Sequence, residues 1–287
     1  MAPRFSWKKI KHMDGVEHVQ PNFPADAFAG TAAYYVRFRI PYPERLLLDL
    51  VRRSAASREG RLLDLACGPG RVALDLAPSF QEIWAVDLEP EMIEAGRREA
   101  ARKGVRNIKW ILARAEDVEA APASTALITV GEAFHRLDQG RVAAQSFQWL
   151  RPGCCVAILG CYTILSGREP WQQVVADIVR RWAKRLAKLG GGSEPRQPGS
   201  GPDHDERVLR AAGFVEVASH PFLEPREWTI DTILGYLYST SVCSKAVLGG
   251  NTEAFEADLK AALFAHDPSG AYRENTQWGY TLGRKPK

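Results

Sequence analysis

A short glycine-rich turn, Cys67-Gly68-Pro69-Gly70, constrains the fold of this chain more than any other feature. An apolar segment leads into the turn and an alanine-rich segment follows it, as in a strand, turn and helix. Gly68 and Gly70 let the backbone approach a ligand closely, and the N-terminus of the following helix offers unpaired N–H groups. Seventeen residues beyond Gly70, a second apolar segment ends in Asp87, whose carboxylate can accept both hydroxyls of a ribose. The pattern predicts a nucleoside-containing cofactor at the edge of a parallel sheet.

The size and composition of the chain are typical of a soluble globular protein. Its 287 residues, 45% hydrophobic and 25% charged, can form one α/β domain with elaborations. The net charge is only +4 and the arginines are scattered, so we expect no nucleic-acid partner. No apolar run reaches about 18 residues and residues 1–14 lack an apolar core, so we expect no membrane association, no secretion signal and a cytoplasmic location.

The cysteines show no CxxC motif and no histidine at metal-ligand spacing. We therefore expect buried, reduced thiols, a reducing compartment and no metal site. The five residues are Cys67, Cys154, Cys155, Cys161 and Cys243.

Strand-like and helix-like segments alternate over residues 61–160. Single helices between strands are typical of βαβ units, which form a parallel sheet with right-handed crossovers. The predicted strands lie at 61–66, 82–87, 107–112, 125–130 and 155–160, and the predicted helices at 44–53, 71–79, 90–103 and 139–150. The fold class is therefore α/β, with a doubly wound and mostly parallel sheet.

The alternation ends after residue 160. The expected elements there are a helix at 168–189, a Gly/Pro/Ser-rich loop or lid at 189–202, a helix at 204–212, a strand at 214–219, a helical segment at 229–248, a helix at 252–265 and a closing strand near 277–282. We expect three parts: a lead-in that closes over the cofactor (1–58), a cofactor-binding core (59–162), and cap helices with the end of the sheet (163–287).

The identity of the cofactor depends on the acids around the turn. Gly68-x-Gly70-x-x-Ala73, followed by Asp87, also matches a dinucleotide fingerprint, so a nicotinamide cofactor is one alternative. Asp64, four residues before Gly68, is a poor neighbour for a pyrophosphate but suits the ammonium of an amino-acid tail. The acid therefore favours a cofactor that carries an amino acid.

Five motifs in order make the chain similar to the class I S-adenosylmethionine-dependent methyltransferases, in their small-molecule branch. The matching runs are Leu63-Asp64-Leu65-Ala66-Cys67-Gly68-Pro69-Gly70, Val86-Asp87-Leu88-Glu89-Pro90-Glu91-Met92, Ala115-Glu116-Asp117, Val130-Gly131-Glu132-Ala133-Phe134-His135 and Arg151-Pro152-Gly153. The resemblance covers roughly residues 60–160. It implies S-adenosylmethionine as cofactor, methyl transfer as activity, and a Rossmann-like seven-stranded sheet with an antiparallel last strand and helical cap inserts.

The same resemblance implies contacts with the adenosine half of the cofactor. Asp87 would hold the ribose hydroxyls, and Leu88 and Met92 would lie on either face of the adenine. Ala115 and Glu116 would meet the polar edge of the adenine.

The methionine half has implied contacts too. Asp64 would orient the ammonium, Gly131 would line the methionine arm, and Tyr34 and Arg39 of the lead-in are candidates for the carboxylate end. The backbone would pass close to the cofactor at Ala66, Cys67, Gly68 and Gly70.

Two residues after the fourth strand are candidates for catalysis. His135 lies at the carboxyl edge of the sheet and can accept a proton from an acceptor group, or it forms only a wall of the site. Glu132 is an alternative base, or it binds a substrate ammonium.

Candidates for substrate binding come from the lead-in and from the segments after residue 160. Tyr35 is either a substrate contact or a core aromatic, and Asp203 is either a pocket residue or a helix N-cap. His204 and Tyr236 complete the set.

The acceptor itself is left open by the sequence. An amine needs only to lose its ammonium proton, whereas a hydroxyl needs a positioned base, so N-methylation and O-methylation are both retained. The whole-chain layout is also similar to N-methyltransferases that act on amino sugars of aminoglycoside antibiotics. Remote alternatives are an NAD(P)-binding oxidoreductase and an inactive binding protein of the same fold. We expect a small-molecule partner and make no prediction of oligomeric state.

Overall fold

The computed structural model describes residues 28, 30–55, 59–188 and 201–287, which build one seven-stranded sheet with helices around it. The strands are β1 (Arg61–Leu65), β2 (Glu82–Asp87), β3 (Ile108–Leu112), β4 (Thr125–Gly131), β5 (Leu150–Tyr162), β6 (Val215–Thr229) and β7 (Ala271–Arg284). Their order is β3-β2-β1-β4-β5-β7-β6, and β7 alone of these seven runs against the others. The predicted mostly parallel sheet with an antiparallel last strand is therefore confirmed.

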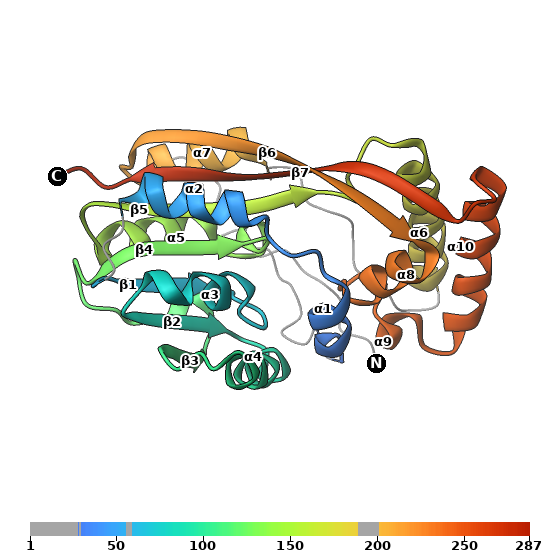
Figure 1. Cartoon of the computed structure of the whole chain (residues 1–287), viewed down its shortest axis with the longest axis horizontal. Helices are drawn as coiled ribbons and strands as arrows, with labels where there is room; N and C mark the ends of the chain where they lie inside the picture. Colours follow the sequence, from blue (N-terminus) through green and yellow to red (C-terminus); the bar gives the residue numbers. More distant parts are fainter. Residues whose placement is uncertain (1–27, 29, 56–58, 189–200) are drawn as a thin grey trace.

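Helices cover both faces of the sheet and extend beyond one of its ends (Figure 1). They are α1 (Ala32–Phe38), α2 (Glu44–Ser54), α3 (Arg71–Leu76), α4 (Pro90–Lys103), α5 (Gln139–Trp149), α6 (Pro170–Lys188), α7 (Pro202–Ala211), α8 (Ile230–Tyr238), α9 (Lys245–Leu248) and α10 (Thr252–His266). None of the helices within the described ranges is long and apolar enough to cross a membrane.

Alternating side chains of the central strands fill two apolar layers. Leu62 and Leu127 pack in the layer that also contains residues of α2 and α3, whereas Leu63 and Ile128 pack in the layer with residues of α5 and α7. All four are fully buried, as expected for parallel strands covered on both faces. The core of the sheet thus fixes the carboxyl ends of β1, β2 and β4 side by side.

The antiparallel pair of β6 and β7, a hairpin whose two strands are connected through α8, α9 and α10, is much longer than the sequence predicts. β7 pairs with β5 only from residue 277 to residue 284, but it pairs with β6 along residues 271–284. The unpredicted half of the hairpin extends past the sheet to α6, α8 and α10, which form the cap (Figure 1). Pro221 and Pro225 resemble strand breakers in the sequence, but β6 is an edge strand, where proline is tolerated.

Three other expectations differ from the structure or fall outside it. Residues of the lead-in form a helix, α1, which lies between the core and the cap (Figure 1). The helical segment expected over 229–248 consists of two helices, α8 and α9, and the side chain of Ser244 caps the second. The expected loop or lid at 189–202 lies almost entirely outside the described residues.

A buried carboxylate joins the hairpin to the cap. Glu274 of β7 is 6% exposed and accepts hydrogen bonds from the side chains of Thr163 (2.7 Å), Trp228 (2.8 Å), Thr276 (2.7 Å) and Gln172. These donors come from the end of β5, from β6, from β7 itself and from α6. Because a buried charge is tolerated only when it is hydrogen-bonded, the set acts as one unit.

We expect Glu274→Ala to lower the free energy of unfolding by about 3 kcal/mol, because it leaves several buried donors without an acceptor. Glu274→Gln keeps an acceptor oxygen and is expected to cost about 1 kcal/mol. Urea denaturation followed by circular dichroism measures both changes.

The matched control is Glu227→Gln on β6, an exposed carboxylate paired with Arg273 at 2.9 Å. A surface change of this kind is expected to alter stability by less than roughly 0.5 kcal/mol. Equal stability of Glu274→Ala and the wild type would show that the hydrogen-bonded set does not stabilise the cap.

Candidate active site

The glycine-rich turn has the tight geometry that the sequence predicts. Ala66, directly after β1, has a φ of +51°, and Gly68 and Gly70 have φ values of +55° and +73°. A Cβ atom on Gly70 would lie 2.4 Å from the ring of Trp110, so this position also needs glycine for space. The N–H of Cys67 donates to the carbonyl of Val86 at 2.9 Å, which holds the turn against β2.

Asp87 anchors this turn. Its Oδ2 accepts from the N–H of Gly68 at 2.7 Å and its Oδ1 from the N–H of Glu89 at 2.9 Å. Burial raises the pKa of Asp87, and these backbone hydrogen bonds partly offset that increase. An ionised carboxylate has about four acceptor positions, more than these backbone N–H groups occupy, so it can also accept from a ribose hydroxyl. The structure thus adds a positioning role to the predicted binding role.

Asp64 is a buried carboxylate with one unused oxygen. It is 1% exposed, and its Oδ1 accepts from the hydroxyl of Thr129 at 2.7 Å. Its Oδ2 has no hydrogen-bond partner within the described ranges. Burial raises the pKa of Asp64 to about 7, although Thr129 and the backbone N–H of Ala73 lower it. An oxygen of this kind at the cofactor turn can accept from a ligand ammonium.

Helix α1 lies over the turn and is held there by Arg71. The guanidinium of Arg71 donates to the carbonyls of Tyr35 at 3.2 Å and Val36 at 3.1 Å. The ring of Tyr35 lies 3.8 Å from the position that a Cβ atom on Gly68 would occupy. Tyr35 therefore lies against the cofactor turn, and its contact with a substrate stays a prediction.

The two residues predicted to enclose an adenine differ in exposure. Leu88 is 42% exposed. Met92 is 3% exposed and belongs to a small buried cluster with Ala32 of α1 and Ala95 of α4. Met92 thus packs in the contact between α1 and α4, while its contact with adenine stays a prediction.

Arg39 connects the lead-in to the core and the cap. Its Nε donates to the hydroxyl of Ser239 at 3.0 Å, and its Nη1 donates to the hydroxyl of Tyr236 at 3.3 Å. The carboxylate of Glu132 lies 3.7 Å from Nη1, and the guanidinium carbon is 4.9 Å from the ring centre of Tyr35. Glu132, a candidate base, and the two candidate substrate contacts Tyr35 and Tyr236 therefore meet around one guanidinium.

Tyr34 does not join Arg39, although the sequence places both at one end of the cofactor. Its ring contacts Tyr238 with 5.3 Å between ring centres, and Lys245 lies 5.5 Å from the ring. Residues five apart on a helix point roughly 140° apart, whereas Tyr35 and Arg39, four apart, share a face. Tyr34 and Arg39 therefore point in different directions, and their assignment to the carboxylate end of the cofactor stays a prediction.

The end of β4 is strained and enclosed. Glu132 has a φ of +52°, a conformation that costs about 1 kcal/mol or more in a residue other than glycine. The thiol of Cys161 donates to its Oε1 at 3.0 Å. A Cβ atom on Gly131 would lie 2.5 Å from the hydroxyl of Tyr42, so glycine is required beside that ring. Burial and then the Glu132 charge raise the pKa of Tyr42 well above its usual value.

Tyr42 and Cys161 are site residues that the sequence interpretation missed. Tyr42 lies in the Pro41-Tyr42-Pro43 segment, and Cys161 lies near the end of β5. The place of Cys161 near the carboxyl end of its predicted strand could have indicated a site residue, because residues at the carboxyl ends of parallel strands gather at one edge of the sheet.

His135 lies four residues beyond the end of β4, in a short 3-10 helix (Phe134–Arg136), and is partly buried. The next residue, Arg136, donates to the hydroxyl of Ser241 at 2.6 Å, with its guanidinium 4.5 Å from the ring of Phe28. Burial and then the nearby Arg39 charge lower the pKa of Arg136 to about 10. Sequence reasoning placed no function at Arg136, yet it adds positive charge beside Arg39.

Two other predicted site residues, Glu116 and His204, form hydrogen bonds within the protein. Glu116 is 5% exposed and accepts from the N–H of Asp138 at 3.0 Å, in the short helix that begins at Ala115. The ring of His204 is hydrogen-bonded to the side chain of Gln139 at 2.8 Å.

The predicted N-cap role of Asp203 is wrong. Gly201 caps α7 and Pro202 is the first helical residue, so Asp203 lies exposed in the first turn. Proline favours the first helical position because its missing N–H is not needed there.

Comparison with known proteins agrees with this geometry. Residues 62–153 match a family model described as a methyltransferase domain. The chain is 34% identical over 99 residues to the uncharacterized methyltransferase YcgJ of Bacillus subtilis, covering 34% of this chain and 39% of that protein. It is 24% identical over 184 residues to the demethylmenaquinone methyltransferase of Geobacillus kaustophilus, covering 61% and 79% of the two chains. The crystal structure of YcgJ superposes with a TM-score of 0.57 at 18% identity, over 85% of this chain and all of that one.

The residues at the turn fit the cofactor of that family. Asp64 offers an unused buried oxygen for an ammonium, and Asp87 keeps free acceptor positions for a ribose. An ammonium next to Asp64 explains why a carboxylate lies at the turn, where a dinucleotide would place its pyrophosphate. Residues 62–153 therefore match a methyltransferase domain, and the residues of its turn fit S-adenosylmethionine as the cofactor.

Proposed function

We propose that this chain transfers the methyl group of S-adenosylmethionine to a nitrogen atom of a small polar molecule. The observation that carries the proposal is the network around Arg39, which joins α1 to β4 and to α8 above the cofactor turn. A site closed by a lead-in helix and a cap helix suits a small molecule better than a polymer.

The cofactor supplies a methyl group on a sulfonium leaving group, so the residues of the chain need only align the acceptor and exclude water. Burial raises the pKa values of Tyr35, Tyr42, Tyr236 and Cys161, so these groups stay protonated at neutral pH. Protonated phenols and thiols can orient an acceptor but cannot remove its proton. This favours an amine, which needs no strong base, over a hydroxyl.

An amino sugar of an aminoglycoside antibiotic is one narrower candidate for the acceptor. Such a polycation needs acids in the site. Glu132 is there, but it is already engaged by Arg39 and Cys161. Asp203 and Asp231 are exposed in the first turns of their helices. Amino sugars are therefore one class of amine to test, with Glu132 as the residue that would meet an ammonium.

Cofactor affinity should depend on pH through Asp64. With a pKa of about 7, its carboxyl is neutral below that pH and ionised above it. We expect affinity for S-adenosylhomocysteine, measured by isothermal titration calorimetry, to rise about tenfold between pH 6 and pH 8 as the carboxylate forms. Asp64→Asn should bind weakly, with no pH dependence in this range.

Asp203→Asn, an exposed carboxyl on α7, is the control for this series and should behave as the wild type. An unchanged pH profile in Asp64→Asn would assign the titration to a different group.

His135→Ala tests the class of acceptor. For an amine acceptor we expect kcat to fall less than tenfold and cofactor affinity to stay unchanged, since no side chain must take the proton. Loss of a general base would instead lower kcat by about 10² to 10⁴. A loss of that size would contradict N-methylation without a base and would favour an O-methyltransferase with His135 as its base.

A further inference from the structure

An arginine of the hairpin, Arg226 on β6, is only partly exposed but has no hydrogen bond or ion pair within the described part of the chain. Its guanidinium carbon lies 5.4 Å from the ring centre of Trp228. A guanidinium carries five N–H donors, and removing them from water without partners is costly. A half-buried arginine of this kind is therefore a candidate for ligand binding.

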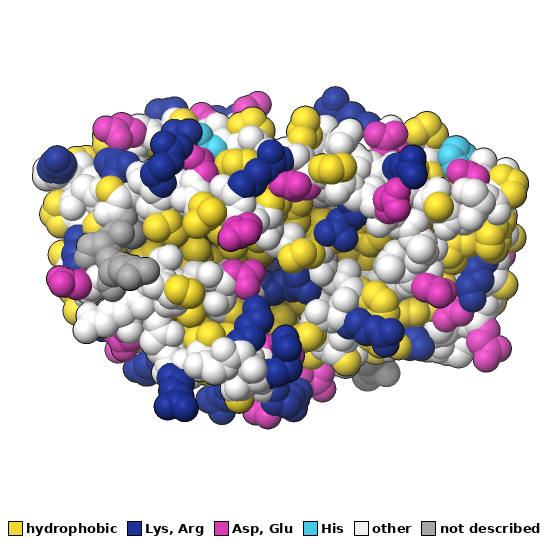
Figure 2. All heavy atoms as spheres, viewed as in Figure 1, with side chains coloured by type: hydrophobic (Ala, Val, Ile, Leu, Met, Phe, Trp, Pro, Cys, Tyr) yellow, Lys and Arg dark blue, Asp and Glu magenta, His cyan; other side chains and the backbone are white. Residues whose placement is uncertain are grey.

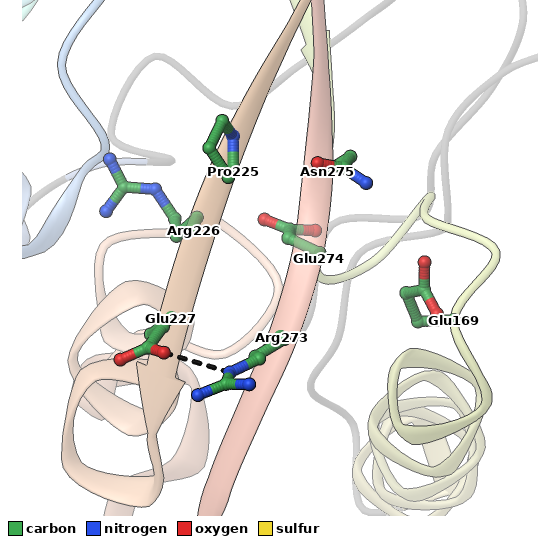
Figure 3. Close-up of a pocket in the computed structure, with 7 residues that line it drawn as sticks. All are labelled: Glu169, Pro225, Arg226, Glu227, Arg273, Glu274 and Asn275. Carbon is green, nitrogen blue, oxygen red and sulfur yellow. Dashed lines mark hydrogen bonds and ion pairs between the residues drawn. The ribbon is translucent and has the colours of Figure 1, made fainter.

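Arg226 lines a pocket of about 490 Å³ (Figure 3). The other lining residues are Glu169, Pro225, Glu227, Arg273, Glu274 and Asn275. Figure 3 shows the guanidinium extending from β6 toward the N-terminal segment, while Glu169 lies on the far side of the hairpin, next to α6. The side chain is therefore directed toward the space between the hairpin and the lead-in.

The carboxylates of the hairpin are engaged elsewhere. Glu227 is paired with Arg273 at 2.9 Å. Glu274, which is opposite Arg226 in the strand register, accepts from four uncharged donors. Uncharged donors thus fill the acceptor positions of Glu274. The guanidinium of Arg226 keeps its positive charge and its N–H donors available for a ligand.

Neighbouring titratable groups connect Arg226 to the cofactor end of the molecule. Burial lowers its pKa, Glu274 and Cys161 raise it, and Arg71 lowers it. Arg71 is the residue that holds α1 over the turn, and Cys161 contacts Glu132. Figure 2 shows basic side chains in the hollow between the core and the cap. Cations that approach each other in such a hollow favour an anion between them.

We propose that Arg226 binds an anionic group, a carboxylate or a phosphate, on the methyl acceptor. A planar guanidinium can contact either group with two parallel hydrogen bonds, which orients as well as attracts it. The inference rests on the proposed function, because it takes the bound molecule to be the acceptor. The acceptor is then a small molecule with an amine at one end and an anion at the other.

The first test measures anion binding without any methyl transfer. Protein saturated with S-adenosylhomocysteine is titrated with inorganic phosphate and, in a separate arm, with acetate, by calorimetry. We expect Arg226→Gln to weaken binding at least tenfold and Arg226→Lys, which keeps the charge but loses the paired contact, to weaken it about threefold. The arm with the higher affinity identifies the anion as a phosphate or a carboxylate.

The matched control is Arg273→Gln, which removes an exposed arginine that lines the same pocket but is paired with Glu227. It should bind phosphate and acetate as the wild type does. Wild-type affinity in Arg226→Gln, or equal weakening in Arg273→Gln, overturns the proposal. Thermal melting and S-adenosylhomocysteine affinity show whether each variant is folded. If Arg226→Gln does not fold, the anion affinity of Arg226→Lys decides the test.

The second test separates the inference from the proposed function. Methyl transfer from labelled S-adenosylmethionine is measured with matched acceptors, phosphoethanolamine against ethanolamine and glycine against glycinamide, within a wider panel of amines. We expect the anionic member to be preferred at least tenfold in kcat/KM, with the preference lost in Arg226→Gln. Transfer without any such preference overturns the anion site alone. Anion binding that depends on Arg226, without transfer to any amine, overturns the proposed function alone.

Discussion

The contact on which the site depends is the guanidinium of Arg39. It lies between three parts of the chain that are far apart in sequence: the lead-in, the end of β4 at Glu132, and α8 at Tyr236 and Ser239. Because an arginine has five donors in a fixed plane, it can hold several acceptors in one geometry where a lysine would hold them loosely. Arg39 thus ties α1 to the core and the cap, while Arg71 holds the same helix over the cofactor turn.

The cap is placed by a different device, the hairpin of β6 and β7. Its paired strands are one continuous element from the sheet to α8, so the position of the cap is set by the core. Glu274 then fixes the inner face of the hairpin against α6 and the end of β5. Rigid support of this kind is what a binding residue such as Arg226 needs, because small displacements remove paired hydrogen bonds.

The sequence was sufficient for the core because its signals are local. The turn at Gly68 and Gly70, the acid Asp87 and the helix at 90–103 each follow from a few neighbouring residues, and all were predicted. The gathering of Arg39, Glu132 and Tyr236 was not, because it depends on contacts that span up to 197 residues. The length of β6 was not predicted because the segment contains prolines, which are tolerated in a strand only at the edge of a sheet. The sequence of one segment does not reveal whether its strand lies at an edge.

The distribution of charge in the hollow argues against a polycationic acceptor. Arg39, Arg136 and Arg226 contribute positive charge near the site, while Glu132 is already paired. At an effective dielectric constant of about 20, two like charges roughly 8 Å apart repel by about 2 kcal/mol, so each additional ammonium of an acceptor would reduce affinity more than tenfold. The proposed acceptor, with one amine and one anion, would avoid that repulsion, because its anion would meet the arginines while its nitrogen would face the end of the cofactor turn. The same arginines that close the site therefore limit the molecules that it can hold.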